Sequence, residues 1–403
     1  METNSGLRPA DVRQNNLASV LGVLRRGSAT RSDLVAATGL TRSTMAGLVS
    51  ELAELGLIDE VSSAATGRPG RPSPLVRLVP GAVAALGIDV SVTRLAVGLV
   101  GLDGRTISVV EREGDRTADS PESTAEAVAE MAQRIGVGGD GAPILVGVGA
   151  AVPGLVRGRD AHVVLAPNLG WTDVAFADLV RTAIHQRLGV LLDVSIGNEA
   201  DLGAMAEARF GVGRRDRNVL YVHGDIGVGG SIVVDGARLP GASGYAGEIG
   251  HMPVNPNGGR CRCGSVGCWE TEIGERVLLE RAGLDPNSGN SGVKKLVVAA
   301  EGGEQRALDA LAENGRWLGV GLAGLINILD PGLVVIGGLF GPLMPYMSDA
   351  LDAELVARRF GPDERVASVV AAEMGTDALL IGAAELALTP ALADPAGWLT
   401  IGG

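Results

Sequence analysis

All three cysteines of this chain lie close together, as Cys261, Cys263 and Cys268, and His251 precedes the first of them by ten residues. One imidazole and three thiolates complete a tetrahedral shell of the type that binds zinc. Because four protein ligands leave no open position for an activated water, the spacing predicts a structural zinc ion that holds this loop in place. Free buried thiols and redox-active thiols are the alternatives, but neither explains the clustering or the nearby histidine.

Length and composition predict a globular protein of at least two domains. The chain has 403 residues, of which 46% are hydrophobic, and one hydrophobic core rarely supports that length. No charged segment precedes an apolar stretch at the N-terminus, and no run of about 18 apolar residues interrupts the sequence. We therefore expect a cytoplasmic protein without a membrane span.

Charge is distributed unevenly along the chain. The net charge is −13, but residues 1–80 hold nine arginines against seven acidic residues and so carry +2, which leaves −15 for the remainder. Only the N-terminal segment is therefore suited to the phosphate backbone of nucleic acid.

Two helices are predicted before residue 40. The first ends at Gly27 and has an apolar stripe at helical spacing, which consists of Leu17, Val20, Leu21 and Leu24. The second begins with a capping box of Thr30 and Asp33 and ends at Gly39. A third helix follows after a short turn at residues 39–41, and two helices joined in this way predict a helix-turn-helix.

The third predicted helix has the pattern of a DNA-recognition helix. Thr41 caps it, and its buried stripe consists of Met45, Leu48, Val49 and Leu52. Small and polar residues remain on its N-terminal side, where the recognition helix of a helix-turn-helix reaches base edges in the major groove. The residues that we expect to contact double-stranded operator DNA are Thr41, Arg42, Ser43, Thr44 and Gly47.

A β-wing is predicted after this helix. Leu57 and Ile58 begin a strand, and residues 75–78 form the strand that returns. Between them, neighbouring prolines stiffen the backbone around Arg68 and Arg71, and arginines at such a tip can enter the minor groove of DNA. The alternative is a small helical domain with a proline-rich linker, which leaves the coincidence of helices, turn and basic wing unexplained.

Two neighbouring motifs carry a resemblance to a known family. Gly-Glu-Ile-Gly-His occupies residues 247–251, and Cys-x-Cys-Gly-x-x-Gly-Cys-x-Glu occupies residues 261–270. These motifs resemble those of the ROK family of sugar kinases and sugar-responsive repressors, and the order of segments is similar from about residue 86 to about residue 392. A preceding winged helix distinguishes the family's repressors from its free-standing kinases.

The resemblance implies an α/β fold in which an N-terminal winged helix-turn-helix, residues 1–80, precedes an actin-like (ribonuclease H-like) two-lobed domain, residues 81–403. The small lobe would contain about 81–197 and 373–403, and the large lobe about 198–372 with the zinc loop at 251–270. The residue pattern agrees, because it predicts strands at 86–89, 93–100, 106–110 and 144–150 and a helix at 122–135.

The resemblance also implies a sugar pocket in the cleft between the lobes. Carboxylates accept hydrogen bonds from vicinal hydroxyls, and amides both donate and accept them. The structural zinc would orient His251 and position the glutamates beside it. The implied sugar-binding residues are Asn168, Asn198, Glu199, Glu248, His251 and Glu270.

Departures from the kinase pattern favour a repressor over an enzyme. The family's kinases carry an aspartate as general base where this chain has Glu199, and Asp-x-Gly-Gly-Thr where residues 89–93 read Asp-Val-Ser-Val-Thr. Asp225 stands where the kinases have a glycine, and its carboxylate would repel a triphosphate. We therefore expect a sugar cleft with no catalytic residue, in which Glu199 is a vestigial base.

The resulting hypothesis is a repressor of carbohydrate-utilisation genes that a sugar releases from its operator. Lobe closure would rotate the winged helices of a homodimer, or of a dimer of dimers, away from half-sites about 34 Å apart. The apolar segment 305–329 predicts either a dimer surface or lobe core. The alternatives are an ATP-dependent sugar kinase with a regulatory DNA-binding head, and a DNA-binding protein whose second domain only dimerises.

Overall fold

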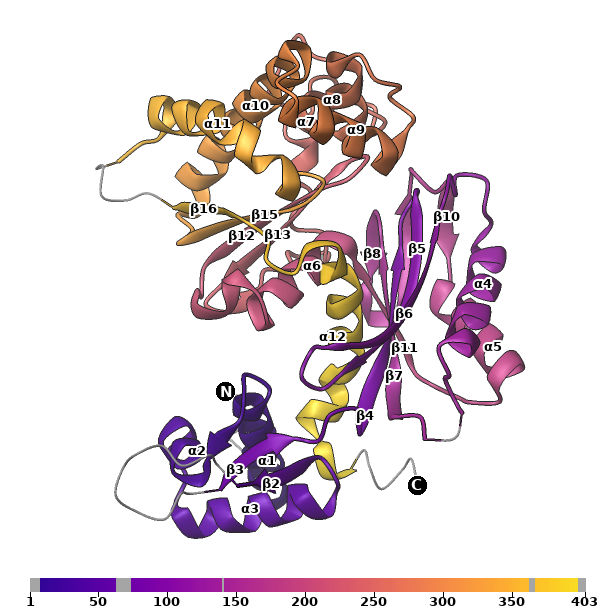
Figure 1. The fold of residues 1–403 in the computed structure, drawn as a ribbon, viewed down its shortest axis with the longest axis vertical. Coiled ribbons are helices and arrows are strands. Elements are labelled where there is room, and N and C mark those ends of the chain that lie inside the picture. The colour runs from indigo at the N-terminus through magenta and orange to yellow at the C-terminus, as the bar shows by residue number, and fades with distance from the viewer. Residues whose placement is uncertain (1–7, 63–73, 140, 362–366, 398–403) are drawn as a thin grey trace.

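The structure is a computed structural model of the chain, and it describes residues 8–62, 74–139, 141–361 and 367–397. Figure 1 shows a small N-terminal head and two larger lobes, with the C-terminal helix α12 (Ala378–Ala393) running from the junction of the lobes toward the head. Helix α12 therefore contacts the head, helix α6 (Glu199–Arg209) and the sheet of one lobe.

The head is a winged helix. Its helices are α1 (Pro9–Leu24), α2 (Arg31–Thr38) and α3 (Arg42–Glu54), and its sheet has the order β1 (Ala29–Thr30), β3 (Leu75–Leu78), β2 (Ile58–Val61). The predicted caps are present, since the Thr30 side chain accepts from the Asp33 N–H and Gly39 ends α2 in a left-handed conformation. β2 and β3 pair antiparallel as predicted for a wing, whereas the predicted tip residues Arg68 and Arg71 lie outside the described residues.

The small lobe is built on a five-stranded sheet. Three strands form an antiparallel meander, and the other two lie parallel to its first strand. In sheet order the strands are β11 (Val194–Asn198), β7 (Ile144–Val152), β4 (Val83–Val90), β5 (Arg94–Gly101) and β6 (Thr106–Glu113). Helices α4 (Pro121–Arg134) and α5 (Phe176–Leu188) cover one face, and a small sheet follows of β10 (Trp171–Val174), β9 (His162–Ala166) and β8 (Leu155–Arg157), with η1 at Gly158–Asp160.

The large lobe repeats this strand order. Its sheet is β14 (Ala237–Arg238), β13 (Val228–Val234), β12 (Val219–Gly224), β15 (Leu333–Gly338) and β16 (Ser368–Ala371), again with an antiparallel meander followed by two parallel strands. Its helices are α6 (Glu199–Arg209), α7 (Glu270–Ile273), α8 (Glu275–Ala282), α9 (Gly289–Glu301), α10 (Gln305–Leu329) and α11 (Met344–Arg358). The short helical turns are η2 (Val212–Arg215), η3 (Ile249–His251), η4 (Gly341–Leu343) and η5 (Gly375–Asp377). Two lobes with the same ribonuclease H-like order confirm the predicted fold class.

Helix α10 belongs to the core of the large lobe, which is one of the two alternatives for residues 305–329. It packs tightly along α11, because a Cβ at Gly315 would lie 2.4 Å from the carbonyl oxygen of Met347 and one at Gly319 would lie 2.7 Å from that of Leu351. Glycine at these two positions therefore allows the two backbones to approach closely.

Helix α12 is apolar on nearly every side because it is enclosed by other elements. Within the described residues, the segment Gly375–Ala393 is long and apolar enough to span a membrane by composition, but 61% of it is buried in the protein, as in a core helix. Leu388 and Ala391 share a hydrophobic cluster with Leu17 and Leu21 of the head. The head therefore packs directly on α12.

The contact between α12 and α6 provides a test of this packing. A Cβ at Gly382 would lie 1.9 Å from the carbonyl oxygen of Leu202 in α6, whereas a Cβ at Gly324 in α10 meets no atom within 4 Å. We expect Gly382→Ala to destabilise the protein by about 1–3 kcal/mol, because the added methyl group could be accommodated only by moving the backbone of one of the two helices. Gly324→Ala should be neutral or stabilising by up to about 1 kcal/mol through helix propensity. Thermal denaturation of both variants measures the difference, and equal shifts would contradict the packing described here.

Candidate functional site

A cavity of about 400 Å³ lies between the lobes. Its size suits a small ligand, and its lining combines carboxylates, amides and backbone groups. Every residue that the sequence singles out for sugar binding is found in this lining: Asn168, Asn198, Glu199, Glu248, His251 and Glu270. The fold therefore brings together residues that lie up to about a hundred positions apart in the chain.

Asn198 and Glu199 stand where strand β11 passes into helix α6. The Asn198 side chain caps the helix, since its Oδ1 accepts from the N–H of Ala200 at 2.8 Å and its Nδ2 donates to the carbonyl oxygen of Gly154 at 2.9 Å. Glu199 Oε2 is buried and has no hydrogen-bond partner among the described residues. Burial raises the pKa of Glu199 well above its ordinary value, and the carboxyl of Asp225 adds to the rise. Glu199 therefore has a buried carboxyl oxygen that could accept a hydrogen bond from a ligand in the cavity.

His251 stands between two carboxylates and the three cysteines. Its Nε2 lies 3.9 Å from Oε2 of Glu248, and its Nδ1 lies 3.8 Å from Oε1 of Glu270 and 3.6 Å from Sγ of Cys261. One ring nitrogen therefore faces the sulfur atoms, whereas the other faces the Glu248 side of the cavity.

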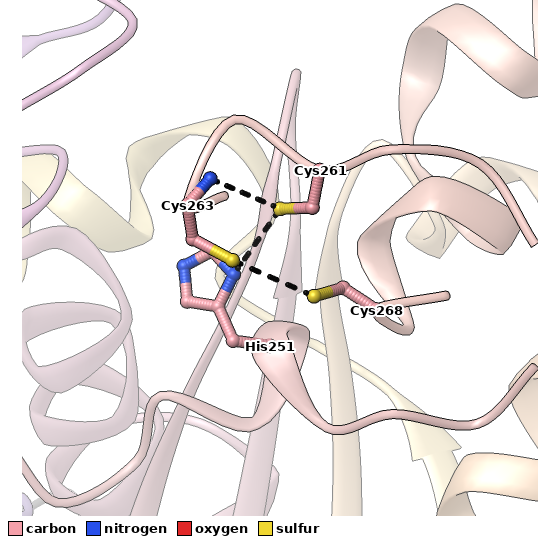
Figure 2. A group of neighbouring side chains, drawn as sticks. All are labelled: His251, Cys261, Cys263 and Cys268. Carbon is pink, nitrogen blue, oxygen red and sulfur yellow. Dashed lines mark hydrogen bonds between the residues drawn. The ribbon is translucent and has the colours of Figure 1, made fainter. Parts of the chain in front are cut away.

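Four side chains form a candidate metal centre, which Figure 2 shows. One donor atom from each of His251, Cys261, Cys263 and Cys268 lies within 4.8 Å of the others, and the sulfur atoms of Cys263 and Cys268 are 3.6 Å apart. Two sulfurs that each lie about 2.3 Å from a tetrahedral zinc ion are separated by about 3.8 Å. The donor set and the spacing of this sulfur pair therefore suit a tetrahedral metal ion.

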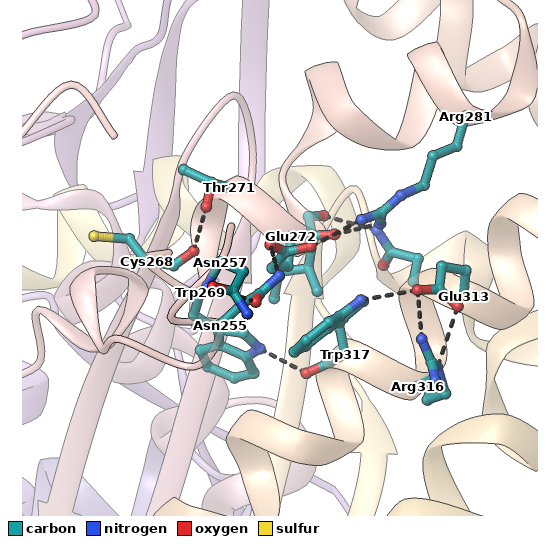
Figure 3. Close-up of polar contacts among 12 residues, drawn as sticks. Asn255, Asn257, Cys268, Trp269, Thr271, Glu272, Arg281, Glu313, Arg316 and Trp317 are labelled. Carbon is teal, nitrogen blue, oxygen red and sulfur yellow. Dashed lines mark hydrogen bonds and ion pairs between the residues drawn. The ribbon is translucent and has the colours of Figure 1, made fainter. Parts of the chain in front are cut away.

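The loop that carries these ligands is anchored to the core of the large lobe (Figure 3). Trp269, which directly follows Cys268, is fully buried and donates its Nε1–H to the carbonyl oxygen of Trp317 in α10 at 2.8 Å. Gly267 has φ +71°, and a Cβ there would lie 1.6 Å from the carbonyl oxygen of Asn255. The loop is thus fixed on the core side, so its exposed side can present residues to the cavity.

Arg262 is a cavity residue that the sequence reasoning missed. It lies between two of the cysteines, and its Nη1 donates to Oδ1 of Asn168 at 2.7 Å. Asn168 comes from the small lobe, between β9 and β10, so this hydrogen bond crosses the cleft. In the sequence, its position between Cys261 and Cys263 could have indicated that Arg262 lies at the site, because a metal ligand on either side restricts its backbone.

A second cavity of about 400 Å³ adjoins the first and shares Asn168 and Arg262 with it. Glu275, which the sequence reasoning also missed, lines this cavity although it is only 2% exposed. Burial, together with the neighbouring carboxyl of Asp225, raises the pKa of Glu275 to about 7. Burial also raises the pKa of Asp225. Two buried carboxyl groups thus lie close together in this part of the cleft.

The segment in the position of the first phosphate loop is closed by an ion pair. Arg94 Nη1 donates to Oδ2 of Asp89 at 2.6 Å and to the carbonyl oxygen of Thr376 at 3.2 Å, and Asp89 is buried. Val92, where the kinase pattern has glycine, is buried in the core of the small lobe. One oxygen of the Asp89 carboxylate is therefore already bound within the protein, whereas its Oδ1 is buried without a hydrogen-bond partner among the described residues.

The predicted DNA-contacting residues lie on the outer side of α3. Thr41 caps the helix by accepting from the Thr44 N–H at 3.2 Å. The residues of this face are exposed, whereas those of the predicted stripe are buried; the exposed set is Thr41, Arg42, Ser43, Thr44 and Gly47. α3 can therefore present its N-terminal end to a partner without exposing its core.

A winged helix joined to a two-lobed domain with a polar cleft defines a ligand-responsive DNA-binding regulator. Comparison with known proteins gives the family. The sequence model of the ROK family matches residues 85–389, and that of the MarR family matches residues 18–69. The chain belongs to the ROK family, and the MarR-type winged helix precedes its ROK domain.

The relatives include repressors and kinases. The chain is 28% identical to the xylose repressor of Bacillus subtilis, over 91% of this chain and 92% of the repressor. It is 32% identical to the glucokinase of Streptomyces coelicolor, over 76% of this chain and 98% of the kinase.

Two solved structures are similar. A ROK family transcriptional regulator, homologous to the E. coli MLC protein, has a TM-score of 0.75 at 23% identity and covers 97% of this chain and 99% of its own. A glucokinase from Streptomyces griseus, in complex with glucose and AMPPNP, has a TM-score of 0.65 at 31% identity and covers 76% and 99%. The match to the regulator extends over the head as well as the lobes, whereas the match to the kinase covers about three quarters of this chain.

The candidate metal centre predicts the metal content of the protein. We expect about one tightly bound metal ion per chain by elemental analysis, and a lower melting temperature after chelation, because the ion holds four ligands of one loop together. Cys268→Ser should lose the ion, whereas Val266→Ala, in the same loop but without a donor atom, should keep it. Purified protein without stoichiometric metal would contradict this assignment.

The buried carboxyl of Glu275 predicts a pH-dependent stability. Because its pKa is raised to about 7 from the ordinary value of 4.5, the folded protein holds a proton that the unfolded chain releases between these two values. Stability is therefore lost as the pH rises through this window. Gln cannot ionise, so Glu275→Gln should raise the melting temperature by a few degrees at pH 8 and have a much smaller effect at pH 4. The exposed Glu301→Gln is the control, and a Glu275→Gln effect that does not depend on pH would disprove the prediction.

Proposed function

We propose that this chain is a sugar-responsive repressor of carbohydrate-utilisation genes that a neutral sugar releases from its operator DNA. One observation carries the proposal: a cavity lined by the six polar side chains of the implied sugar site belongs to the same chain as an exposed recognition helix. The similarity to xylose repressors along most of the chain supports it. Such a protein acts where the DNA is, so we place it in the cytoplasm.

The cavity suits a polyol. Glu199 has an unpaired buried oxygen, and Glu248 and Glu270 stand at the other side of the cavity. A hydroxyl-bearing ligand would satisfy the unpaired Glu199 oxygen, and an analogue without the hydroxyl would leave it unpaired, which is the basis of sugar selectivity. The described lining contains no lysine, and its arginine, Arg262, is already hydrogen-bonded to Asn168. We therefore propose a neutral sugar rather than a sugar phosphate.

We propose that the metal ion is zinc and that its role is structural. A shell of one imidazole and three thiolates matches the preference of zinc and has no position left for water. When bound, the ion would supply a fixed geometry and no reaction. Nδ1 of His251, which lies 3.6 Å from Cys261 Sγ, would be the ligand, so that Nε2 remains free to bind a sugar hydroxyl.

Phosphoryl transfer is not part of this proposal. We propose that ATP does not bind in the second cavity, because Glu275 lines it and the carboxyl of Asp225 interacts with Glu275, so that acidic groups would lie beside the phosphates. Asp89, in the position of the first phosphate loop, already accepts a hydrogen bond from Arg94 through its Oδ2. The 32% identity to a glucokinase keeps an ATP-dependent sugar kinase as the second candidate, and sugar-dependent ATP consumption well above background would favour it.

For the head, we propose that α3 enters the major groove with Arg42 and its neighbours at base edges. Half-sites of one operator about 34 Å apart would require two heads, and hence a homodimer or a dimer of dimers. The head would be residues 1–80 and the sensor residues 81–403. Closure of the lobes on a sugar would change the separation of the two heads and lower the affinity for the operator.

The proposal predicts the behaviour of a pocket variant. We expect Glu248→Gln to weaken sugar binding by at least about tenfold, because a charged hydrogen-bond acceptor is lost. The variant should keep its metal ion and its affinity for operator DNA, but it should need correspondingly more sugar for release in a mobility-shift titration. Glu126→Gln, on the exposed face of α4, serves as the control.

The direction of the response is a further outcome of the same titration. If every sugar in a panel of neutral monosaccharides tightened DNA binding, the sugar would be a co-repressor and derepression would be wrong. If no sugar stabilised the protein in thermal denaturation, the second domain would be a dimerisation module only.

A further inference from the structure

A buried arginine of the head is held entirely by the sugar-binding domain. Arg25 directly follows α1, and its side chain is 1% exposed. Its Nη1 donates to Oε1 of Glu385 in α12 at 2.8 Å, and its Nη2 donates to Oε2 of the same carboxylate. Its Nε donates to the carbonyl oxygen of Leu102, at the turn after β5, at 2.6 Å. The C-terminal end of α1 is therefore tied to atoms outside the head.

The same carboxylate is bound by the end of helix α6. Nε of Arg209, the last residue of α6, lies 3.2 Å from Oε1 of Glu385. Phe210 follows, and the guanidinium of Arg25 lies over its ring at 5.3 Å from the centroid. We call this cluster of Arg25, Arg209, Phe210 and Glu385 the head joint.

Helix α6 also reaches the sugar cavity. Its first residue is Glu199, whose buried carboxyl lines the cavity, and its last residue belongs to the head joint. Eleven residues of helix span about 16 Å at about 1.5 Å per residue. Leu202, the fourth residue of α6, lies against Gly382 of α12 without room for a Cβ, so the two helices contact each other near the cavity end of α6.

We propose that the head joint is the element through which occupation of the sugar cavity changes the orientation of the winged helix. The inference rests on the proposed function. A ligand that draws Glu199 toward it moves α6 as a rigid rod, and the far end of that rod carries Arg209 and Phe210 against Arg25. Glu385 then has two arginines that compete for its oxygens.

The chemistry of the joint favours such a role over simple adhesion. A buried ion pair contributes little more to stability than well-packed apolar residues of the same volume, because desolvation offsets the attraction. A bidentate arginine–carboxylate pair does, however, have one geometry, whereas an apolar contact can slide. The joint therefore gives the head a defined orientation that shifts in a discrete step.

The test measures coupling rather than affinity. The probes are the neutral monosaccharide that stabilises the wild-type protein most in thermal denaturation and a duplex selected by the protein from a random DNA library. The affinity for the duplex is measured with and without sugar, and the affinity for sugar with and without duplex. The two ratios must agree, and they define the coupling factor.

Two variants separate coupling from folding. Arg209→Met removes the α6 side of the joint at a residue that is 42% exposed, so the fold should tolerate it. The double variant Arg25→Met with Glu385→Leu removes both fully buried charges and leaves neither unpaired. Each should bind sugar and DNA singly within about threefold of wild type, with a coupling factor reduced by at least about fivefold. Arg217→Met, at a surface ion pair of the large lobe, is the control and should leave coupling unchanged.

The outcomes distinguish this inference from the proposed function. A wild-type coupling factor of one would overturn the proposed function, and the head joint with it. Normal wild-type coupling that persists in both variants would overturn the head joint alone. Loss of single-ligand binding in both variants would show that the joint holds the fold together, and it would also overturn the inference.

Discussion

Helix α12 packs against the small-lobe sheet, helix α6 and the head at the same time. The rest of the structure depends on how closely the helix approaches these three surfaces. On the small lobe, a Cβ at Gly149 of β7 would lie 1.7 Å from the carbonyl oxygen of Ala383, and one at Gly87 of β4 would lie 2.3 Å from that of Leu380. These glycines let the sheet meet the helix backbone to backbone. On its other sides α12 meets α6 and the head. The lobe, the cavity-lining helix and the DNA-binding head therefore share one rigid support.

The electrostatics of the cleft select the kind of ligand that this support can respond to. Burial raises the pKa of Glu199 well above its ordinary value and that of Glu275 to about 7, with Asp225 close to both. Carboxyl oxygens accept hydrogen bonds from hydroxyl groups, so this lining suits a ligand that carries them. The same crowding of carboxyls raises the free energy of placing a phosphate there. In the proposed function, this distribution of charge would favour a neutral sugar over a phosphorylated ligand.

A feature of this molecule could be predicted from the sequence when the residues that interact in it lie close together along the chain. The caps at Thr30 and Thr41 act within three residues, so their pattern is visible in the sequence and both helices begin where predicted. The four candidate metal ligands are nearly as local. The pair of Arg25 and Glu385 joins residues 360 positions apart, and no local pattern indicates either partner. Glu275 looks like an ordinary helix-starting glutamate, and only the packing of α8 against the cleft reveals that it is buried.

The cavity itself explains why sugar can control the head at all. A ligand shifts a conformational equilibrium only by the difference in its affinity for the two states. Asn168 comes from the small lobe, whereas Glu248 and His251 come from the large lobe, so a ligand that contacts all three binds more tightly when the lobes are close together. The hydrogen bond between Arg262 of the large lobe and Asn168 of the small lobe spans this gap. In the proposed function, a sugar that binds Asn168 would replace this bridge between the lobes with its own contacts, and it would thereby change how the lobes are held together.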